Sequence, residues 1–238
     1  MVRFLPPFDG PERKSPGQRP RRLKDLEKTH LRFTHPPLRA DTSGVTLLDE
    51  PRTTSTLNLK PWGWLVAAAS GVGIVSGSIT IVDKIALLKD PAQGSFCDIS
   101  STVGCTPVLL AWQSSVLGPP NALLGVIMFA VLATAGLAVA TGGLLARGLT
   151  TGLLGLNVFF AAFLTWYMYE VAFSIGSLCP FCTVCAAGCL VSLVGVNRLA
   201  AAGGLPLAQR LAHGGLDVLV ALGWAAIIAA MLFSGIWL

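Results

Sequence analysis

Charged side chains are scarce in this sequence: Asp, Glu, Lys and Arg make up 12% of its 238 residues, whereas 53% are hydrophobic. The mean hydropathy is +0.68. A water-soluble domain needs a polar surface around its core, and this composition leaves too few polar side chains to form one. A soluble globular protein is therefore excluded, and we expect the chain to lie in a bilayer.

The first 60 residues lack cysteine and also lack the apolar run of a signal peptide, so the first membrane span is expected to direct insertion. They hold 12 of the 17 Lys and Arg and 7 of the 12 Asp and Glu, which gives this stretch a net charge of +5. Proline and charged residues recur in it without an apolar period, so it cannot bury enough surface to offset the entropy of ordering. We predict a disordered basic cytoplasmic tail over residues 1–60.

The sequence pI of about 9.1 could suggest nucleic-acid binding if it described the whole chain. The surplus of positive charge lies in the tail alone, since the remaining residues balance to zero. A basic segment before a first span usually keeps that segment in the cytoplasm. No nucleic-acid partner is expected.

Five stretches are long and apolar enough to cross a membrane, for which a helix needs about 20 largely apolar residues. They cover residues 62–88, 122–146, 149–176, 179–199 and 216–238. A polar loop, residues 89–121, separates the first two. The fold class predicted from these stretches is an all-α integral membrane protein with a multi-pass topology.

The orientation follows from the Lys and Arg residues near the span ends, which favour the cytoplasmic side. With the tail inside, the connections that carry Arg147, Arg198 and Arg210 are also cytoplasmic. The 89–121 loop, the 177–182 corner and the C-terminus are then on the outer face. This places four of the six cysteines in the compartment where disulfides persist: Cys97, Cys105, Cys179 and Cys182.

A Cys-x-x-Cys, Cys179-Pro180-Phe181-Cys182, opens the fourth predicted span. Free backbone N–H groups and the helix dipole stabilise a thiolate at a helix start, and this spacing lets two sulfurs exchange a disulfide within one turn. A structural disulfide or half of a zinc site are the alternatives. Zinc would need Cys97 and Cys105 as well, which are eight residues apart, because all three histidines fall on the inner side.

Two more cysteines, Cys185 and Cys189, follow in the same predicted helix, so that Cys182 and Cys185 form a second, overlapping Cys-x-x-Cys. Spacing alone does not choose between the two motifs. Because Cys185 and Cys189 lie deeper in the helix, we expect them to be inert, apolar-packed thiols.

The loop cysteines Cys97 and Cys105 are spaced for an internal disulfide or for two separate exchange partners. Two pairs on one face suggest a relay, in which a loop pair meets water-soluble proteins and a membrane pair receives the disulfide by thiolate attack. Glu170, near the outer end of the third span, is a candidate proton relay or an interfacial carboxylate. Asp83 and Lys84, near the outer end of the first, are expected to pair with each other or with lipid headgroups and receive no role.

Four motifs in this order resemble the vitamin K epoxide reductase family, in particular its bacterial branch without a fused thioredoxin-like domain. The resemblance covers residues 61–199 and is carried by Cys97-Asp98-Ile99-Ser100-Ser101 through Cys105, Trp112-Gln113-Ser114-Ser115-Val116, Asn121-Ala122-Leu123-Leu124-Gly125 and Cys179-Pro180-Phe181-Cys182. Two positions depart from the family pattern: Ala111 replaces a frequent serine, and Ala186 replaces a frequent aromatic residue.

The resemblance implies a four-helix bundle around a quinone, menaquinone or ubiquinone, with residues 200–238 adding a cytoplasmic connection and a fifth transmembrane helix. Cys97 would face a partner protein, Cys105 would exchange with Cys179, and Cys182 would lie closest to the quinone. Asn121 and Trp112 are the quinone contacts that it implies. From the residues alone, an amide at the start of a span can donate to a quinone carbonyl, while a helix N-cap is the alternative for Asn121.

The function that this resemblance implies is a quinone-dependent thiol oxidoreductase in the bacterial plasma membrane. Its expected partners are an extracytoplasmic thioredoxin-like protein, which introduces disulfides into exported proteins, and the quinone pool of the membrane lipid. No metal is expected. The alternatives are a vitamin K epoxide or quinone reductase driven by an external thiol, and a non-catalytic metal-binding membrane protein.

Overall fold

The computed structural model describes residues 58–237, with side chains as far as Ile236, so the predicted tail lies almost wholly outside the described residues. Five long helices account for most of this part: α1 (Lys60–Lys89), α3 (Asn121–Ala140), α4 (Arg147–Glu170), α5 (Pro180–Ala202) and α7 (Leu216–Trp237). Shorter elements connect them: η2 (Pro91–Gln93), α2 (Thr106–Leu110), η3 (Trp112–Ser115), η4 (Val171–Ile175), α6 (Pro206–Ala212) and η5 (His213–Gly215).

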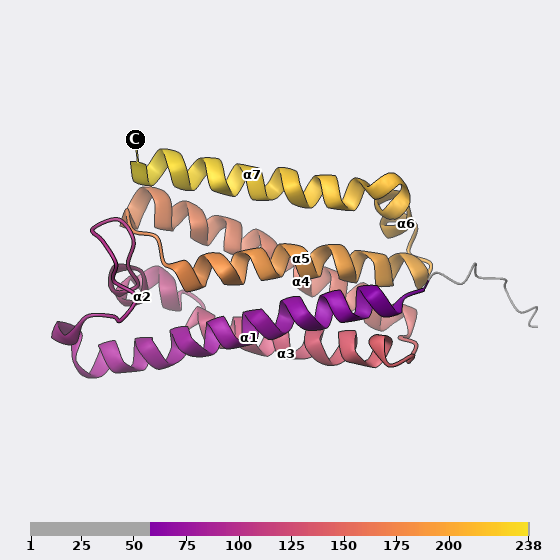
Figure 1. Cartoon of the computed structure of the whole chain (residues 1–238), viewed down its shortest axis with the longest axis horizontal. Helices are drawn as coiled ribbons and strands as arrows, with labels where there is room; N and C mark the ends of the chain where they lie inside the picture. Colours follow the sequence, from indigo (N-terminus) through magenta and orange to yellow (C-terminus); the bar gives the residue numbers. More distant parts are fainter. Residues whose placement is uncertain (1–57, 238) are drawn as a thin grey trace, which may run out of the picture. The chain divides into compact units, whose positions relative to one another are not determined.

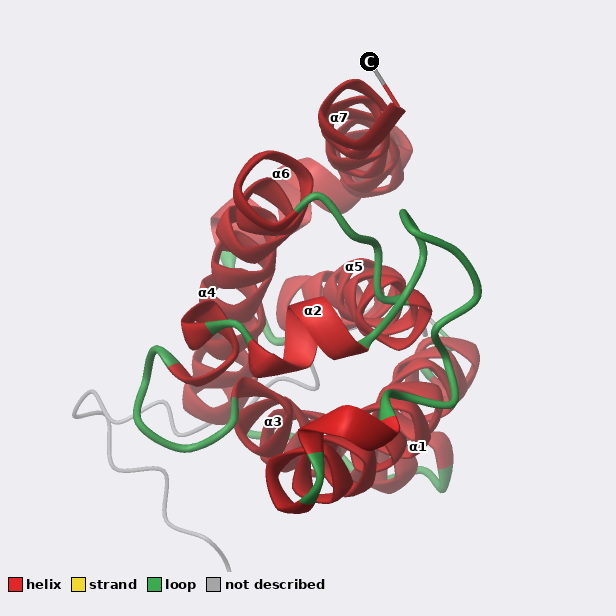
Figure 2. Cartoon of the chain, turned by 90° about the vertical axis from the view of Figure 1, so that its left-hand side faces the viewer, coloured by secondary structure: helices red, strands yellow, loops and turns green. Residues whose placement is uncertain are grey.

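All five long helices are apolar enough to cross a bilayer, α4 together with the π-helical turn η4 and α7 together with α6. The chain is therefore a multi-pass, all-α membrane protein, as predicted. In Figure 1, α2 and the end of α7 lie at one end of the bundle, whereas α6 and the start of α1 lie at the other. Figure 2 looks onto the end that carries α2 and shows the helices side by side.

Helix α1 forms the most extensive contacts, with α3 on one side and α5 on the other, and α4 completes the group by packing on α5. Glycine allows the closest of these approaches. A Cβ at Gly63 of α1 would lie 2.6 Å from the backbone nitrogen of Ala140, and one at Gly136 of α3 would lie 2.8 Å from the carbonyl oxygen of Gly63. Small residues of this kind let membrane helices meet backbone to backbone, where van der Waals packing is strongest.

Helix α7 lies against α4, η4 and α5 at the edge of this group and leaves much of its apolar surface exposed. Polar contacts help to hold it. The indole Nε1 of Trp224 donates to Thr165 Oγ1 of α4 at 2.7 Å, and Arg198 of α5 forms a bidentate ion pair with Asp217 at 2.5 and 2.6 Å. The guanidinium of Arg198 also lies 4.9 Å from the ring centre of Trp62, which joins the start of α1 to the same cluster.

Three features differ from the prediction. The second span ends at Ala140 rather than at residue 146, because the chain turns at Gly142, whose φ of 100° is left-handed and ends the helix although the sequence stays apolar. The 89–121 connection contains short helices, and a separate short helix, α6, precedes the fifth span. Apolar composition alone gives no signal for the turn at Gly142 or for these short helices.

Candidate redox site

Cys179 occupies the N-cap position of α5, with Pro180 directly after it in the first turn. Its sulfur accepts the backbone N–H of Cys182 at 3.4 Å. The hydrogen bond from the Cys182 thiol, aided by the backbone N–H groups of Cys182 and Phe181, lowers the pKa of Cys179 despite burial and the nearby carboxylate of Asp83. The Cys182 thiol is therefore the main cause of the lowered pKa of Cys179, and the backbone N–H groups of the helix start, on which the sequence argument relied, contribute less.

The loop pair forms an internal disulfide between Cys97 and Cys105, whose Cα atoms are 5.7 Å apart. Of the two arrangements that the spacing allowed, the structure thus has the joined one. Both residues are buried, Cys97 to 6% and Cys105 to 1% exposure, although Phe96 and Ile99 on the same loop are largely exposed. The ring centre of Phe96 lies 5.7 Å from that of Phe181, a residue that stands between Cys179 and Cys182 in the sequence.

The two cysteine pairs meet at one point, where the sulfurs of Cys105 and Cys179 are 3.3 Å apart. Backbone pairing holds them there: a parallel bridge joins Val103 to Leu178, with hydrogen bonds from Gly104 N to Leu178 O at 3.0 Å and from Leu178 N to Thr102 O at 2.8 Å. Van der Waals contact between a thiolate and a disulfide sulfur is what thiol–disulfide exchange requires. The arrangement is therefore suited to pass a disulfide between the loop and α5.

Asp98, directly after Cys97, organises the loop. Its carboxylate accepts the backbone N–H groups of Ser95 at 2.9 Å, Cys105 at 2.8 Å and Thr106 at 3.0 Å, and the hydroxyl of Thr106 at 2.6 Å. Desolvation opposes its ionisation, but the bonds from Thr106, Ser95 and Cys105 outweigh it, so the pKa of Asp98 lies below its ordinary value. The ionised carboxylate fixes Cys105 at the start of α2.

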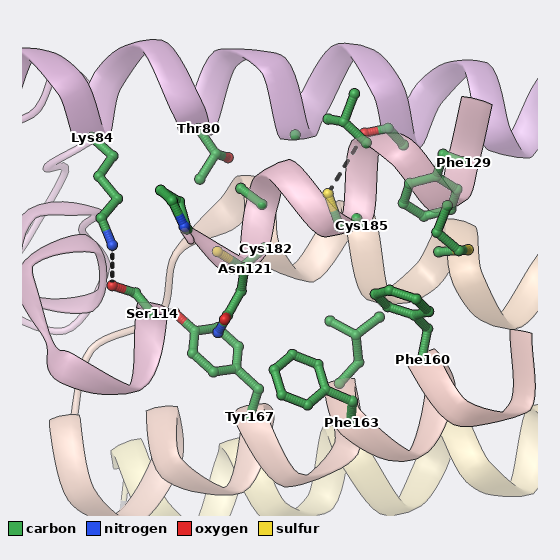
Figure 3. A pocket seen from close by; sticks show the side chains of 18 of the residues that line it. Thr80, Lys84, Ser114, Asn121, Phe129, Phe160, Phe163, Tyr167, Cys182 and Cys185 are labelled. Carbon is green, nitrogen blue, oxygen red and sulfur yellow. Dashed lines mark hydrogen bonds between the residues drawn. The ribbon is translucent and has the colours of Figure 1, made fainter. Parts of the chain in front are cut away.

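A pocket of about 710 Å³, its open side included, lies between α1, α3, α4 and α5 next to Cys182. Its walls are mostly apolar and aromatic, with Phe129, Phe160 and Phe163 on the inner part (Figure 3). Its polar groups are few: Thr80, Lys84, Ser114, Asn121 and Tyr167. A mainly apolar cavity with a small number of converging polar groups is the usual form of a small-molecule site.

Asn121 is the first residue of α3, and the N-cap is Pro120, without a side-chain cap, so the N-cap interpretation of Asn121 is wrong. Its amide Nδ2 donates to the carbonyl oxygen of Gln113 at 2.6 Å. Its Oδ1 is buried and has no hydrogen-bond partner among the described residues. One N–H and one acceptor oxygen therefore stay unused in the pocket, which suits a ligand with a carbonyl or hydroxyl group.

Lys84 and Asp83, to which the sequence reasoning assigned no role, are buried next to the cysteine pairs and the pocket. They are each 7% exposed and form no ion pair with each other, so the expected pairing is wrong within the described residues. The ammonium of Lys84 instead lies 2.6 Å from the hydroxyls of Ser114 and Ser115, at the rim of the pocket (Figure 3). The signal was present in the sequence, because two ionisable residues inside a predicted span are functional candidates by default.

Not all predicted residues come to the pocket. Trp112 is 68% exposed and does not line it. Cys185 does line it, one helical turn beyond Cys182, whereas the buried thiol of Cys189 donates to Asn157 Oδ1 at 3.2 Å. Glu170 accepts a hydrogen bond from Gln113 Nε2 at 3.1 Å, so it ties α4 to the segment that positions Asn121.

Within residues 58–237, one group of side chains has the spacing of metal ligands, namely Asp83, Cys97 and Cys105. The two sulfurs are joined in the disulfide and so lack the thiolate character that zinc needs. The four-cysteine zinc arrangement weighed from the sequence is therefore not the one formed here.

A membrane helix bundle that brings two cysteine pairs into contact beside an apolar pocket belongs to the class of membrane thiol–disulfide oxidoreductases. The family model described as the vitamin K epoxide reductase family matches residues 64–196, more than half of the chain, and the chain belongs to this family. No curated protein and no solved structure matches the chain. The predicted family is thus confirmed, and its bacterial branch stays a prediction.

Proposed function

We propose that this protein takes electrons from a thioredoxin-like protein on the outer face of a bacterial plasma membrane and passes them through two cysteine pairs to a quinone. The observation that carries the proposal is the continuous path of sulfur atoms. Cys97 and Cys105 are joined, Cys105 lies 3.3 Å from Cys179, and Cys182, one turn further along α5, lines the pocket. Each step of the path needs only thiolate attack on a neighbouring disulfide.

The order of steps follows from these positions. A partner thiolate attacks Cys97, and Cys105 leaves as a thiolate. The second thiol of the partner then resolves this mixed disulfide, which releases the oxidised partner and leaves Cys97 as a thiol. Cys105 attacks Cys179 of the Cys179–Cys182 disulfide, and Cys182 leaves as a thiolate. Cys97 then attacks Cys105 to restore the loop disulfide and release Cys179. The lowered pKa of Cys179 makes it a good leaving group in this last exchange.

The pocket fits a quinone headgroup. Its aromatic walls suit the ring, Asn121 offers an unused N–H and an unpaired oxygen, and Lys84 places a positive charge at the rim. A quinone accepts two electrons and two protons, and its potential, well above that of a dithiol, sets the direction from thiols to quinone. Asn121 and Lys84 would stabilise the charge that develops on the carbonyl oxygens.

The outer location of this site rests on the distribution of Lys and Arg along the chain. Cysteine pairs that persist as disulfides belong in an oxidising compartment, which agrees with this orientation. A thioredoxin-like partner fits because the loop that carries Cys97 also exposes Phe96 and Ile99, an apolar contact surface for another protein.

Cysteine substitutions test the proposal in purified protein reconstituted with a quinone and a reduced thioredoxin-like protein. Quinone reduction, followed by its absorbance change, should be lost in each of the single Ser variants of Cys97, Cys105, Cys179 and Cys182. Cys189→Ser, in the same helix but outside the pocket, is the matched control and should retain activity. Full activity in Cys179→Ser would overturn the relay.

The partner and the direction need separate experiments. In cells, Cys105→Ser should trap a mixed disulfide between Cys97 and the partner, which mass spectrometry identifies. Vitamin K epoxide supplied with a dithiol should not be turned over. Turnover of the epoxide, together with failure to oxidise the trapped partner, would instead favour the reductase alternative.

A further inference from the structure

A hydrogen-bonded chain links the loop disulfide to a buried carboxylate of α1. The hydroxyl of Ser95 lies 3.1 Å from the sulfur of Cys97 and donates a short hydrogen bond to Asp83 Oδ2. The backbone N–H of Cys97 donates to the same hydroxyl at 3.2 Å, which holds Ser95 in place. The carboxylate oxygen of Asp83 and the sulfurs of Cys97 and Cys105 all lie within 4.8 Å of one another.

The position of Asp83 calls for an explanation. It is 7% exposed, lies on a helix that is long and apolar enough to cross a membrane, and forms no ion pair among residues 58–237. Ser95 is the one side chain in this part of the structure that donates a hydrogen bond to it. A buried carboxylate without a cation is costly, so such groups are kept where they serve a function.

We propose that Asp83 and Ser95 form a proton relay that activates Cys97 when it restores the loop disulfide. This inference rests on the proposed relay between the cysteine pairs and assigns it a base. Ser95 contacts the reacting sulfur and is the catalytic group, whereas Asp83 acts through Ser95.

The relay belongs to the step in which Cys97 resolves the mixed disulfide between Cys105 and Cys179. The proton of the Cys97 thiol passes to Ser95 Oγ while the proton of Ser95 passes to Asp83. The Cys97 thiolate attacks Cys105, the Cys97–Cys105 bond forms, the Cys105–Cys179 bond breaks, and Cys179 leaves as a thiolate. No external oxidant is needed, because one disulfide is exchanged for another.

The other ionisable groups near this site have partners of their own. Lys84, the next residue of α1, binds the hydroxyls of Ser114 and Ser115. Asp98 of the loop is occupied by Ser95 N, Cys105 N and Thr106. Cys179 of α5 is hydrogen-bonded to Cys182, and Asp90 at the end of α1 accepts from Ala92 N. Asp83 is the group connected to Cys97 through a hydroxyl.

The test follows decay of the mixed disulfide. Reduced full-length protein is oxidised, the reaction is stopped with acid and N-ethylmaleimide at increasing times, and the Cys105–Cys179 and Cys97–Cys105 linkages are quantified by mass spectrometry. In Asp83→Asn, the Cys105–Cys179 linkage should accumulate at pH 7 and decay about 30-fold more slowly, because only about 3% of a thiol that ionises near pH 8.5 is thiolate there. Ser95→Ala should show the same loss.

The pH profile separates a base from a structural residue. The decay rate should be nearly constant from pH 6 to 8 in the unaltered protein, whereas in Asp83→Asn it should rise about tenfold per pH unit until the thiol ionises by itself. Asp83→Glu should restore the flat profile. Asp90→Asn, which removes an exposed carboxylate from the same helix end, is the matched control and should decay like the unaltered protein.

Oxidation of the reduced protein by a quinone in one experiment and by diamide in another keeps this inference distinct from the proposed function. Oxidation by diamide bypasses the quinone, so the exchange can be followed even if the protein reduces no quinone, in which case the proposed function alone fails. Unaltered decay rates and pH profiles in Asp83→Asn and Ser95→Ala would overturn the proton relay of Asp83 and Ser95. If Asp83→Asn does not fold, Ser95→Ala decides, since it leaves α1 unchanged.

Discussion

Helix α5 carries four cysteines, and the surroundings of the first two differ from those of the last two. Cys179, at the N-cap, faces the sulfur of Cys105, and Cys182 lines the pocket. Cys185 directs its thiol to the carbonyl oxygen of Gly73 at 3.8 Å, and Cys189 is buried against Asn157. One helix therefore contains both the pair that meets the loop disulfide and two further thiols, Cys185 in the wall of the pocket and Cys189 inside the bundle.

The difference shows that position, rather than residue type or spacing, decides what a cysteine in this helix can do. Cys182 and Cys185 have the same spacing as Cys179 and Cys182, but in the described part of the chain the sulfur contact with the loop disulfide is made by Cys179, which also occupies the helix start. Only Cys179 has both a stabilised thiolate and a disulfide sulfur at van der Waals distance.

The largest contrast is expected between Cys179→Ser and Cys189→Ser. The first removes the sulfur that meets Cys105, so the rate of quinone reduction should fall by at least about 1,000-fold, since residues that form covalent intermediates are not replaced by neighbours. The second alters a thiol outside the path and should stay within about twofold of the unaltered rate. Steady-state assays with reduced partner measure both. Equal losses would erase the distinction between the two halves of α5.

The reactivity of the thiols gives a second contrast. Because the pKa of Cys179 is lowered, its thiolate fraction should persist below the pH at which an ordinary thiol is protonated. Both Cys179 and Cys189 are buried, so thiolate character decides between them, and in protein with an intact Cys97–Cys105 disulfide N-ethylmaleimide should modify Cys179 before Cys189 at pH 7. Rates for single peptides come from mass spectrometry. Modification of Cys189 before Cys179 would contradict the assignment.

Loss of a quinone contact should have a smaller effect than loss of a sulfur. Asn121→Ala removes the unused amide group from the pocket, so the KM for quinone should rise about tenfold, the cost of roughly one hydrogen bond to a buried ligand. Exchange between the cysteine pairs should be unaffected. Trp112→Ala, which alters an exposed side chain outside the pocket, is the matched control. A larger effect from Trp112 than from Asn121 would reverse their roles.

The smallest effect concerns the alignment of the two pairs. A Cβ at Gly104 would lie 2.7 Å from Asp98 Oδ1, so Gly104→Ala should shift the carboxylate that holds Cys105. We expect exchange between Cys105 and Cys179 to slow about threefold, since small misplacements of reacting groups lower rates without abolishing them. Rapid-quench measurements of the mixed disulfide test this.

The five spans and the Cys-x-x-Cys at a helix start could be predicted because each depends on local sequence: the length of an apolar run, or a proline after an N-cap. The end of α3 was missed although its signal is local, because the Gly142-Gly143 dipeptide, which marks a turn, lies between apolar residues. Helix α2, of five residues, was missed because so short a helix is stabilised by its surroundings rather than by its own sequence.

The site was predicted in part for the same reason. The order of the motifs pointed to Asn121. Only the structure shows that the amide nitrogen of Asn121 donates to the carbonyl oxygen of Gln113 and that its Oδ1 has no partner among the described residues, which favours a ligand. The distance between Cys105 and Cys179 depends on segments 74 residues apart in the chain. Asp83 and Lys84 were set aside as a neighbouring pair of opposite charge, yet in α1 one side chain meets Ser95 and the other meets Ser114.

The bridge between Val103 and Leu178 has a consequence for selectivity. It confines Cys105 to a small volume around Cys179, and effective concentrations of this kind reach about 10⁵ M or more in well-oriented pairs. Glutathione and other dissolved thiols, present at millimolar levels at most, cannot compete for the same sulfur on the timescale of the internal step. In the proposed relay, the two backbone hydrogen bonds between this loop and Leu178 would thus favour exchange inside the protein over attack by dissolved thiols.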